Sequence, residues 1–99
     1  MNERRVRFTE TAAHHVEFER TWWIENRDYQ EVFATEVEHA MRLVALLPGS
    51  GALYPQTSVT DLRRLYLPKI GCHLYYTFDD AEVTIRALWG ASRERGPSI

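Results

Sequence analysis

Three short runs of apolar, β-branched and aromatic residues fill the final third of the chain, and they constrain the fold more than any other feature. The runs are Leu62 to Leu67, Cys72 to Phe78 and Val83 to Trp89. They are separated by Pro68-Lys69-Ile70-Gly71 and by Asp79-Asp80-Ala81-Glu82. Runs of this length between turn-forming residues are typical of neighbouring antiparallel strands. The sequence therefore predicts a three-stranded antiparallel sheet in this region.

Two stretches before these runs have the apolar period of amphipathic helices. The first is predicted to begin at about Glu10, because Thr9 can accept hydrogen bonds from the free amides of a first helical turn. It is predicted to end at the turn Asn26-Arg27-Asp28. Its period predicts a buried face with Ala12, Val16 and Trp23, and an exposed face with Glu17, Glu19 and Glu25.

The second helical stretch is more regular and has a clear end. Its buried face is predicted to contain Phe33, Val37, Ala40, Met41, Val44 and Leu47. Pro48-Gly49-Ser50-Gly51 ends the helix, because proline has no amide hydrogen to donate and glycine accepts left-handed geometry. The segment from Ala52 to Asp61 has no sustained period and is predicted to be a loop.

A chain of 99 residues has room for one two-layered core, so we expect a single domain over residues 1–99. Val6-Arg7-Phe8 predicts a short strand that joins the sheet. The expected fold is α+β: a short N-terminal strand, then an antiparallel two-helix hairpin packed on a C-terminal antiparallel sheet (β-α-α-β-β-β). Since the helices cover one face of the sheet, we expect function on the other face.

The basic residues are concentrated near the C-terminus, although the formal net charge is −2 and the pI is near 6.1. The whole surface therefore does not supply the attraction that dominates nucleic-acid binding. Strict alternation along the last strand predicts one face with Ile85, Ala87 and Trp89 and the other with Thr84, Arg86 and Leu88. Burying an unpaired arginine is costly, so Arg64 and Arg86 are expected to face solvent or a partner.

Other features predict ordinary structural roles. Cys72, the single cysteine, is predicted to be a buried reduced thiol. His14, His15 and His39 with Glu10 and Glu17 are interpreted as solvated helix faces and not as a metal site. No motif indicates a cofactor. No apolar run approaches the ~20 residues of a membrane span, and polar residues follow Met1, so we expect a cytoplasmic protein without a membrane partner.

Several motifs, in this order and spacing, resemble the RelE/ParE superfamily of bacterial type II toxins. They are FTxxA near the start, LLPGSG at the end of the second helix, and then LRRLYL, HLYYTF and ALWGASRERGP. The resemblance covers nearly the whole chain. It implies a small toxin that is held inactive by a cognate antitoxin, which lays an extended or helical segment across the toxin's helices and sheet edge. The aromatic residues expected to bind this antitoxin are Phe18, Trp22 and Tyr29.

The superfamily includes ribosome-dependent messenger-RNA endonucleases similar to RelE and inhibitors of DNA gyrase similar to ParE. The first branch uses lysines, arginines and a late tyrosine or histidine for proton transfer and charge neutralisation. If this chain is a ribonuclease, the resemblance assigns catalysis to Arg64, Arg86 and Arg93. Gln56, Thr57 and Ser58 occupy positions comparable to those of the expected lysines. Ile99 stands where the late tyrosine of that branch would be expected.

These departures favour the ParE-like branch, in which the toxin binds gyrase and catalyses no reaction itself. The resemblance then assigns target binding to Arg63, Arg64, Arg86, Arg93 and Arg95, with Trp89 as a structural anchor. Trp89-Gly90 stands where many relatives have His-Gly. Two alternatives remain: a RelE-like endoribonuclease acting on the ribosome, and an inactive toxin fold that serves only as a binding module.

Overall fold

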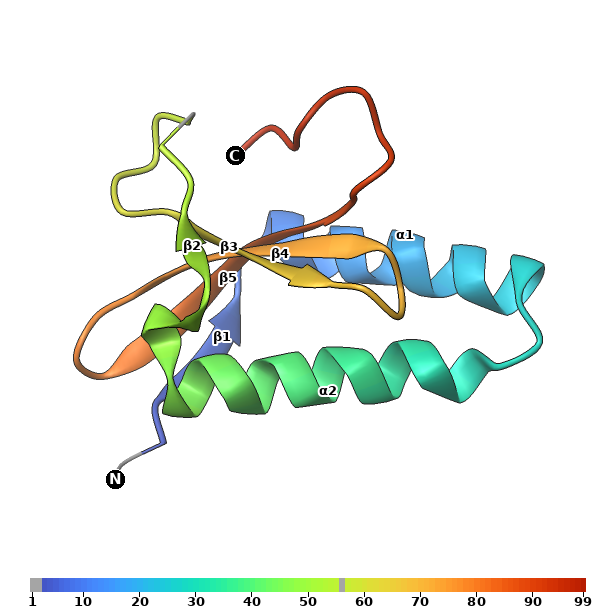
Figure 1. Cartoon of the computed structure of the whole chain (residues 1–99), viewed down its shortest axis with the longest axis horizontal. Helices are drawn as coiled ribbons and strands as arrows, with labels where there is room; N and C mark the ends of the chain where they lie inside the picture. The colour runs from blue at the N-terminus through green and yellow to red at the C-terminus, as the bar shows by residue number, and fades with distance from the viewer. Residues whose placement is uncertain (1–2, 56) are drawn as a thin grey trace.

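The computed structural model describes residues 3–55 and 57–99, so Met1, Asn2 and Gln56 lie outside it. Its elements follow the expected β-α-α-β-β-β order, with one short extra strand and one 3₁₀ turn (Figure 1). They are β1 (Arg5–Phe8), α1 (Glu10–Asn26), α2 (Gln30–Leu46), η1 (Pro48–Ser50), β2 (Ala52–Leu53), β3 (Arg63–Leu67), β4 (Cys72–Phe78) and β5 (Glu82–Gly90). The predicted α+β class is confirmed.

The five strands form one sheet in the order β1-β5-β4-β3-β2. The predicted antiparallel meander of β3, β4 and β5 is confirmed, and β1 joins it as a parallel neighbour of β5. The prediction of a loop from Ala52 was wrong for its first two residues, since Ala52 and Leu53 pair antiparallel with Arg64 and Arg63 as strand β2. A strand of two residues is too short to show a period of two in the sequence.

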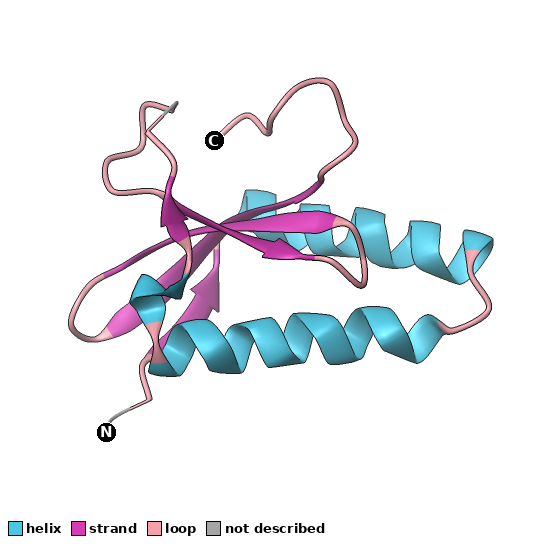
Figure 2. Cartoon of the chain, viewed as in Figure 1, coloured by secondary structure: helices cyan, strands magenta, loops and turns pink. Residues whose placement is uncertain are grey.

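Both helices lie on the same face of the sheet, and the loop after β2 and the C-terminal segment lie over the opposite face (Figure 2). The larger core cluster lies between helices and sheet; its most buried members include Ala12, Phe33, Val44, Leu74, Tyr76 and Ile85. A smaller cluster of Leu62, Tyr75 and Ala87 lies on the other face, where Tyr54, Val59, Trp89 and Ile99 pack against it. Loop and tail thus cover part of the face expected to carry function.

The predicted ends of the helices are confirmed. The Oγ1 of Thr9 accepts a hydrogen bond from the amide of Ala12 at 3.1 Å, which satisfies one of the free donors of the first turn. Helix α2 ends at Leu46, just before Pro48. In residues 3–55 and 57–99 neither the length nor the apolarity of any helix is sufficient to cross a membrane.

Strand β5 contains a β-bulge that the sequence did not reveal. Tyr75 pairs with Ala87 but Tyr76 pairs with Ile85, so Arg86 is an extra residue between two regular pairs. The prediction of strict alternation was therefore wrong beyond this point. Leu88 belongs to the core beneath the helices together with Ile85, whereas Ala87 and Trp89 belong to the opposite face.

The buried hydroxyl of Tyr76 ties β4 to the segment that follows α2. It donates a hydrogen bond to the carbonyl of Pro48 at 2.7 Å and accepts one from the amide of Gly51 at 2.8 Å. A Cβ atom at Gly51 would lie 2.6 Å from this hydroxyl, closer than non-bonded atoms approach. The close approach therefore explains why glycine occupies position 51.

Candidate functional site

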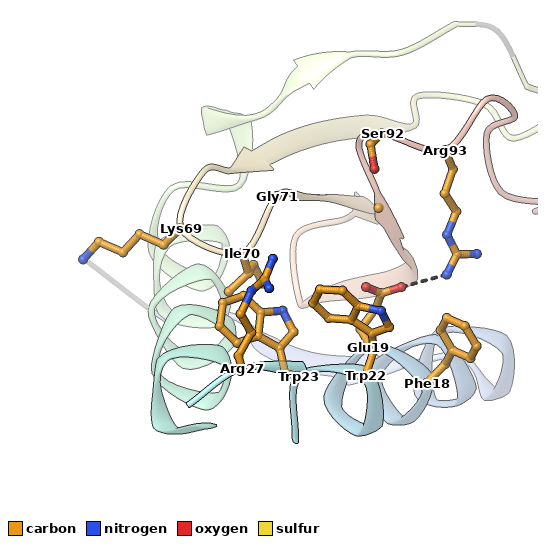
Figure 3. A pocket seen from close by; sticks show the side chains of 11 residues that line it. Phe18, Glu19, Trp22, Trp23, Arg27, Lys69, Ile70, Gly71, Ser92 and Arg93 are labelled. Atoms are coloured by element: carbon orange, nitrogen blue, oxygen red, sulfur yellow. Dashed lines mark hydrogen bonds and ion pairs between the residues drawn. The ribbon is translucent and has the colours of Figure 1, made fainter. Parts of the chain in front are cut away.

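A pocket of about 610 Å³ opens between the C-terminal half of α1, the turn between β3 and β4, and the segment after β5 (Figure 3). The helix and its C-cap contribute Phe18, Glu19, Trp22, Trp23 and Arg27. The rest of the lining is Lys69, Ile70, Gly71, Gly90, Ser92 and Arg93. The pocket thus combines three aromatic rings with three cations and one carboxylate.

Glu19 is buried at the inner wall of this pocket, so the prediction that it lies on the exposed face of α1 was wrong. Its Oε2 accepts a hydrogen bond from the Nη2 of Arg93 at 2.8 Å, and its Oε1 lies 3.6 Å from the Sγ of Cys72. Both partners are more than 50 residues away in the chain. A helical period that counts apolar residues has no means of detecting a buried carboxylate with such distant partners.

Arg93 connects α1 with the segment that follows β5. Its guanidinium carbon lies 4.1 Å from the ring centroid of Trp89 and 4.9 Å from that of Phe18. A cation at these distances is attracted by the electron-rich ring faces. The Glu19 carboxylate and the two rings therefore hold the Arg93 guanidinium in one place.

His15 lies beside this group and is half-buried, so its interpretation as part of a solvated helix face was wrong. Its ring meets the edge of the Trp89 ring with centroids 5.1 Å apart, and its Nδ1 accepts the amide of Leu88 at 3.4 Å. Burial, and next the positive charge of Arg93, lower the pKa of His15 below its ordinary value. The lowered pKa favours the neutral form of the ring, in which Nδ1 can act as an acceptor.

Cys72 is buried, as predicted, and its thiol stays protonated near pH 7. Burial, and next the Glu19 carboxylate, raise the pKa of its thiol from 9.0 to about 12. Since the thiolate is the nucleophile, this thiol is inert near pH 7. Cys72 therefore packs the inner wall of the site and supplies no chemistry.

This raised pKa predicts a loss of stability in alkaline solution. The folded state holds the thiol proton more tightly than the unfolded chain, so the free energy of unfolding should fall as pH rises from about 9 towards 12. Urea denaturation across this range measures the fall. In a Cys72→Ala variant the decline should be shallower than in the parent chain, and equal slopes would contradict the assignment.

The five arginines assigned to target binding do not form one cluster. Arg64 and Arg86 lie on the face away from the helices, where Arg64 lies 4.5 Å from the Tyr54 ring centroid and Arg86 donates to the Oγ1 of Thr77 at 2.9 Å. Arg63 instead donates to the carbonyl of Gly51 at 2.7 Å. Arg95 is exposed, and its carbonyl accepts a hydrogen bond from the Trp89 indole at 2.6 Å.

Arg64 lies at one end of a row of aromatic side chains on the same face of the sheet. Tyr54 lies 5.4 Å from Tyr75, Tyr75 lies 6.2 Å from His73, and His73 lies 5.0 Å from Tyr66, measured between ring centroids. Burial, and next the Arg64 charge, lower the pKa of His73. A row of aromatic rings, of which Tyr75 is buried, therefore lies beside Arg64 on the face where the resemblance assigned a basic target-binding surface.

Two of the three aromatic residues assigned to antitoxin binding line the pocket. Phe18 is 59% exposed and Trp22 is 40% exposed, which is unusual for such large apolar side chains on a helix. Tyr29 lies at the start of α2 and is 69% exposed, but is not part of the pocket lining. Sequence analysis missed Arg27 and Lys69, because turn residues rich in charge are usually only solvated.

Comparison with solved structures shows a likeness in fold. No family model and no curated protein matches this sequence. A chain of the chromosomal ParDE toxin-antitoxin system from P. aeruginosa superposes with a TM-score of 0.72 over 91% of this chain and 98% of its own length, at 13% sequence identity. At such low identity the likeness concerns the fold. The fold implied by the resemblance to the RelE/ParE superfamily is therefore confirmed.

Proposed function

We propose that this chain is the toxin of a type II toxin-antitoxin pair, of the ParE-like kind. It acts in the cytoplasm on DNA gyrase or a related target, and a cognate antitoxin neutralises it. The observation that carries the proposal is the shared fold, since a chain of a ParDE toxin-antitoxin system matches 91% of this one. Fold alone does not fix function, so the arrangement of the arginines has to support the choice of branch.

The position of Arg93 supports a binding role over catalysis. A ribonuclease site of Arg64, Arg86 and Arg93 needs three cations around one scissile phosphate. Here Arg93 is paired with Glu19 of α1, whereas Arg64 and Arg86 contact side chains on the face away from the helices. Arg64 and Arg86, with exposed Arg95, are proposed as the centre of the target-binding surface, and Arg63 and Arg93 as residues that hold its shape.

Phe18 and Trp22 are proposed to bind the antitoxin. Their exposed rings lie along α1, on the other side of the sheet from the proposed target surface. Tyr29 is proposed as an outlying contact at the helix turn. An antitoxin that binds along α1 would leave Arg64 and Arg86 uncovered unless a further segment crosses the sheet edge.

Induced expression in a bacterial host tests this proposal. The chain should arrest growth, and co-expression with the adjacent gene should relieve the arrest. A DNA-damage response with intact messenger RNA supports action on gyrase, whereas messages cut on translating ribosomes favour the endoribonuclease. Arg64→Gln and Arg86→Gln should remove the arrest, with Arg42→Gln, a matched loss of charge on α2, as control. Absence of arrest would contradict a toxin role.

A further inference from the structure

We propose that the pocket beside α1 binds an acidic segment of the antitoxin, with a carboxylate of that segment held at Arg27 and Lys69 and an apolar side chain held between Phe18 and Trp22. This inference rests on the proposed function and names the chemistry of the partner. It is argued from the charge and the exposed rings of the pocket.

The charge of the pocket is unbalanced at one end. Among the charged residues that line the pocket, Glu19 pairs with Arg93, whereas neither Arg27 nor Lys69 has a carboxylate partner within the lining (Figure 3). Within residues 3–55 and 57–99 no carboxylate pairs with Arg27, whose guanidinium lies 4.8 Å from the Trp22 ring centroid and 5.7 Å from that of Trp23. An anion that enters the pocket therefore meets a cation held above two indole rings.

Lys69 is available to the same anion. Its Nζ lies 3.7 Å from the Oε1 of Glu36, a residue of α2 outside the pocket, and the lysine side chain is 72% exposed. The Glu36 side chain is 14% exposed, so the loss of this partner would be costly for a largely buried carboxylate. An ammonium group has three donor hydrogens, so the exposed Lys69 can bind a second carboxylate in the pocket while it stays beside Glu36.

Exposed rings extend the site along the helix. Two smaller hollows adjoin the pocket and share Phe18 with it: one of about 290 Å³ reaches Trp89, and one of about 320 Å³ reaches Thr21. The second of these also shares Trp22 and is bordered by two carboxylates, Glu17 and Glu25. Glu17 is paired with Arg20 at 3.2 Å, so Glu25 supplies most of the negative charge at this hollow. This distribution of charge orients a bound segment, because its acidic side chain is attracted to Arg27 and Lys69 and repelled from the hollow beside Glu25.

Selection from a random dodecapeptide library displayed on phage tests the inference without knowledge of the antitoxin. Peptides selected on the folded chain should be enriched in Asp or Glu together with Leu, Phe or Trp. Their affinity should fall about tenfold in the double variant Arg27→Gln/Lys69→Gln, since two partly exposed charge contacts are lost. It should also fall with added salt. Arg42→Gln is the matched control and should bind as the parent chain does.

Phe18→Ser gives a second, independent measurement of where the peptides bind. Phe18 is exposed, so its replacement should leave the circular dichroism spectrum unchanged while it weakens peptide binding at least as strongly as the loss of both cations. Selected peptides without acidic residues, or with affinity unchanged in the double variant, would overturn the inference, as would failure to select any peptide sensitive to Phe18→Ser. If the chain arrests growth in the bacterial host but the peptide experiments give one of these outcomes, the proposed toxin function is kept and only the inference about the pocket is wrong.

Discussion

Replacement of Tyr76 by alanine is expected to lower the free energy of unfolding by about 4 kcal/mol, the largest loss of any single substitution considered for this chain. Tyr76 has no exposed surface and lies in the core between helices and sheet. Its removal leaves a cavity and also frees the carbonyl of Pro48 and the amide of Gly51. Because small domains are stable by only about 5–15 kcal/mol, urea denaturation should show a chain close to unfolding.

Tyr76→Phe separates the hydroxyl from the ring. It should cost about 1–3 kcal/mol, because the buried amide of Gly51 and carbonyl of Pro48 lose a hydrogen-bond partner while the core stays filled. Gly51→Ala should cost about 2 kcal/mol alone, since the new methyl group overlaps the Tyr76 hydroxyl. Combined with Tyr76→Phe it should cost less, because part of the overlap is gone. Strict additivity in this double-mutant cycle would contradict the contact.

Local patterns account for the parts of the fold that the sequence predicted correctly. The cap at Thr9, the helix end before Pro48 and the turn at Asp79 each depend on residues within a few positions of one another. Asp79 is an example, since its Oδ1 accepts the amides of Ala81 and Glu82 at 2.8 and 2.9 Å. Such hydrogen bonds are determined by residue type and spacing, so sequence alone was sufficient.

Distant contacts account for what the sequence could not predict. The bulge at Arg86 depends on how β5 pairs with β4, and the burial of Glu19 depends on Arg93, 74 residues later. The pocket itself arises only where α1 meets the turn that carries Lys69 and the segment that carries Arg93. The sequence therefore indicated Phe18 and Trp22 as unusual aromatics, but not the cations that surround them.

Replacement of Arg93 by glutamine is expected to destabilise the chain more than replacement of Glu19 by glutamine, although the two residues form one ion pair. Glu19 is the more buried partner, with 12% of its side chain exposed against 33% for Arg93. Without Arg93 the weak donor Cys72 is the remaining hydrogen-bond partner of this buried side chain among the described residues, at a cost of about 3 kcal/mol. Without the Glu19 charge, Arg93 can still stack on Trp89 and Phe18 and reach solvent, at a cost of about 1 kcal/mol.

Urea denaturation of both variants at pH 7 measures this difference, with Arg95→Gln as the matched control that should change stability by less than about 0.5 kcal/mol. A double variant, Glu19→Leu/Arg93→Leu, should recover part of the loss seen for Arg93→Gln, because no unpaired charge remains buried. Equal losses for the two single variants would show that the pair is effectively exposed to water. Arg93 would then be free to act on a target, and the assignment of Arg93 as a residue that holds the shape of the site would be wrong.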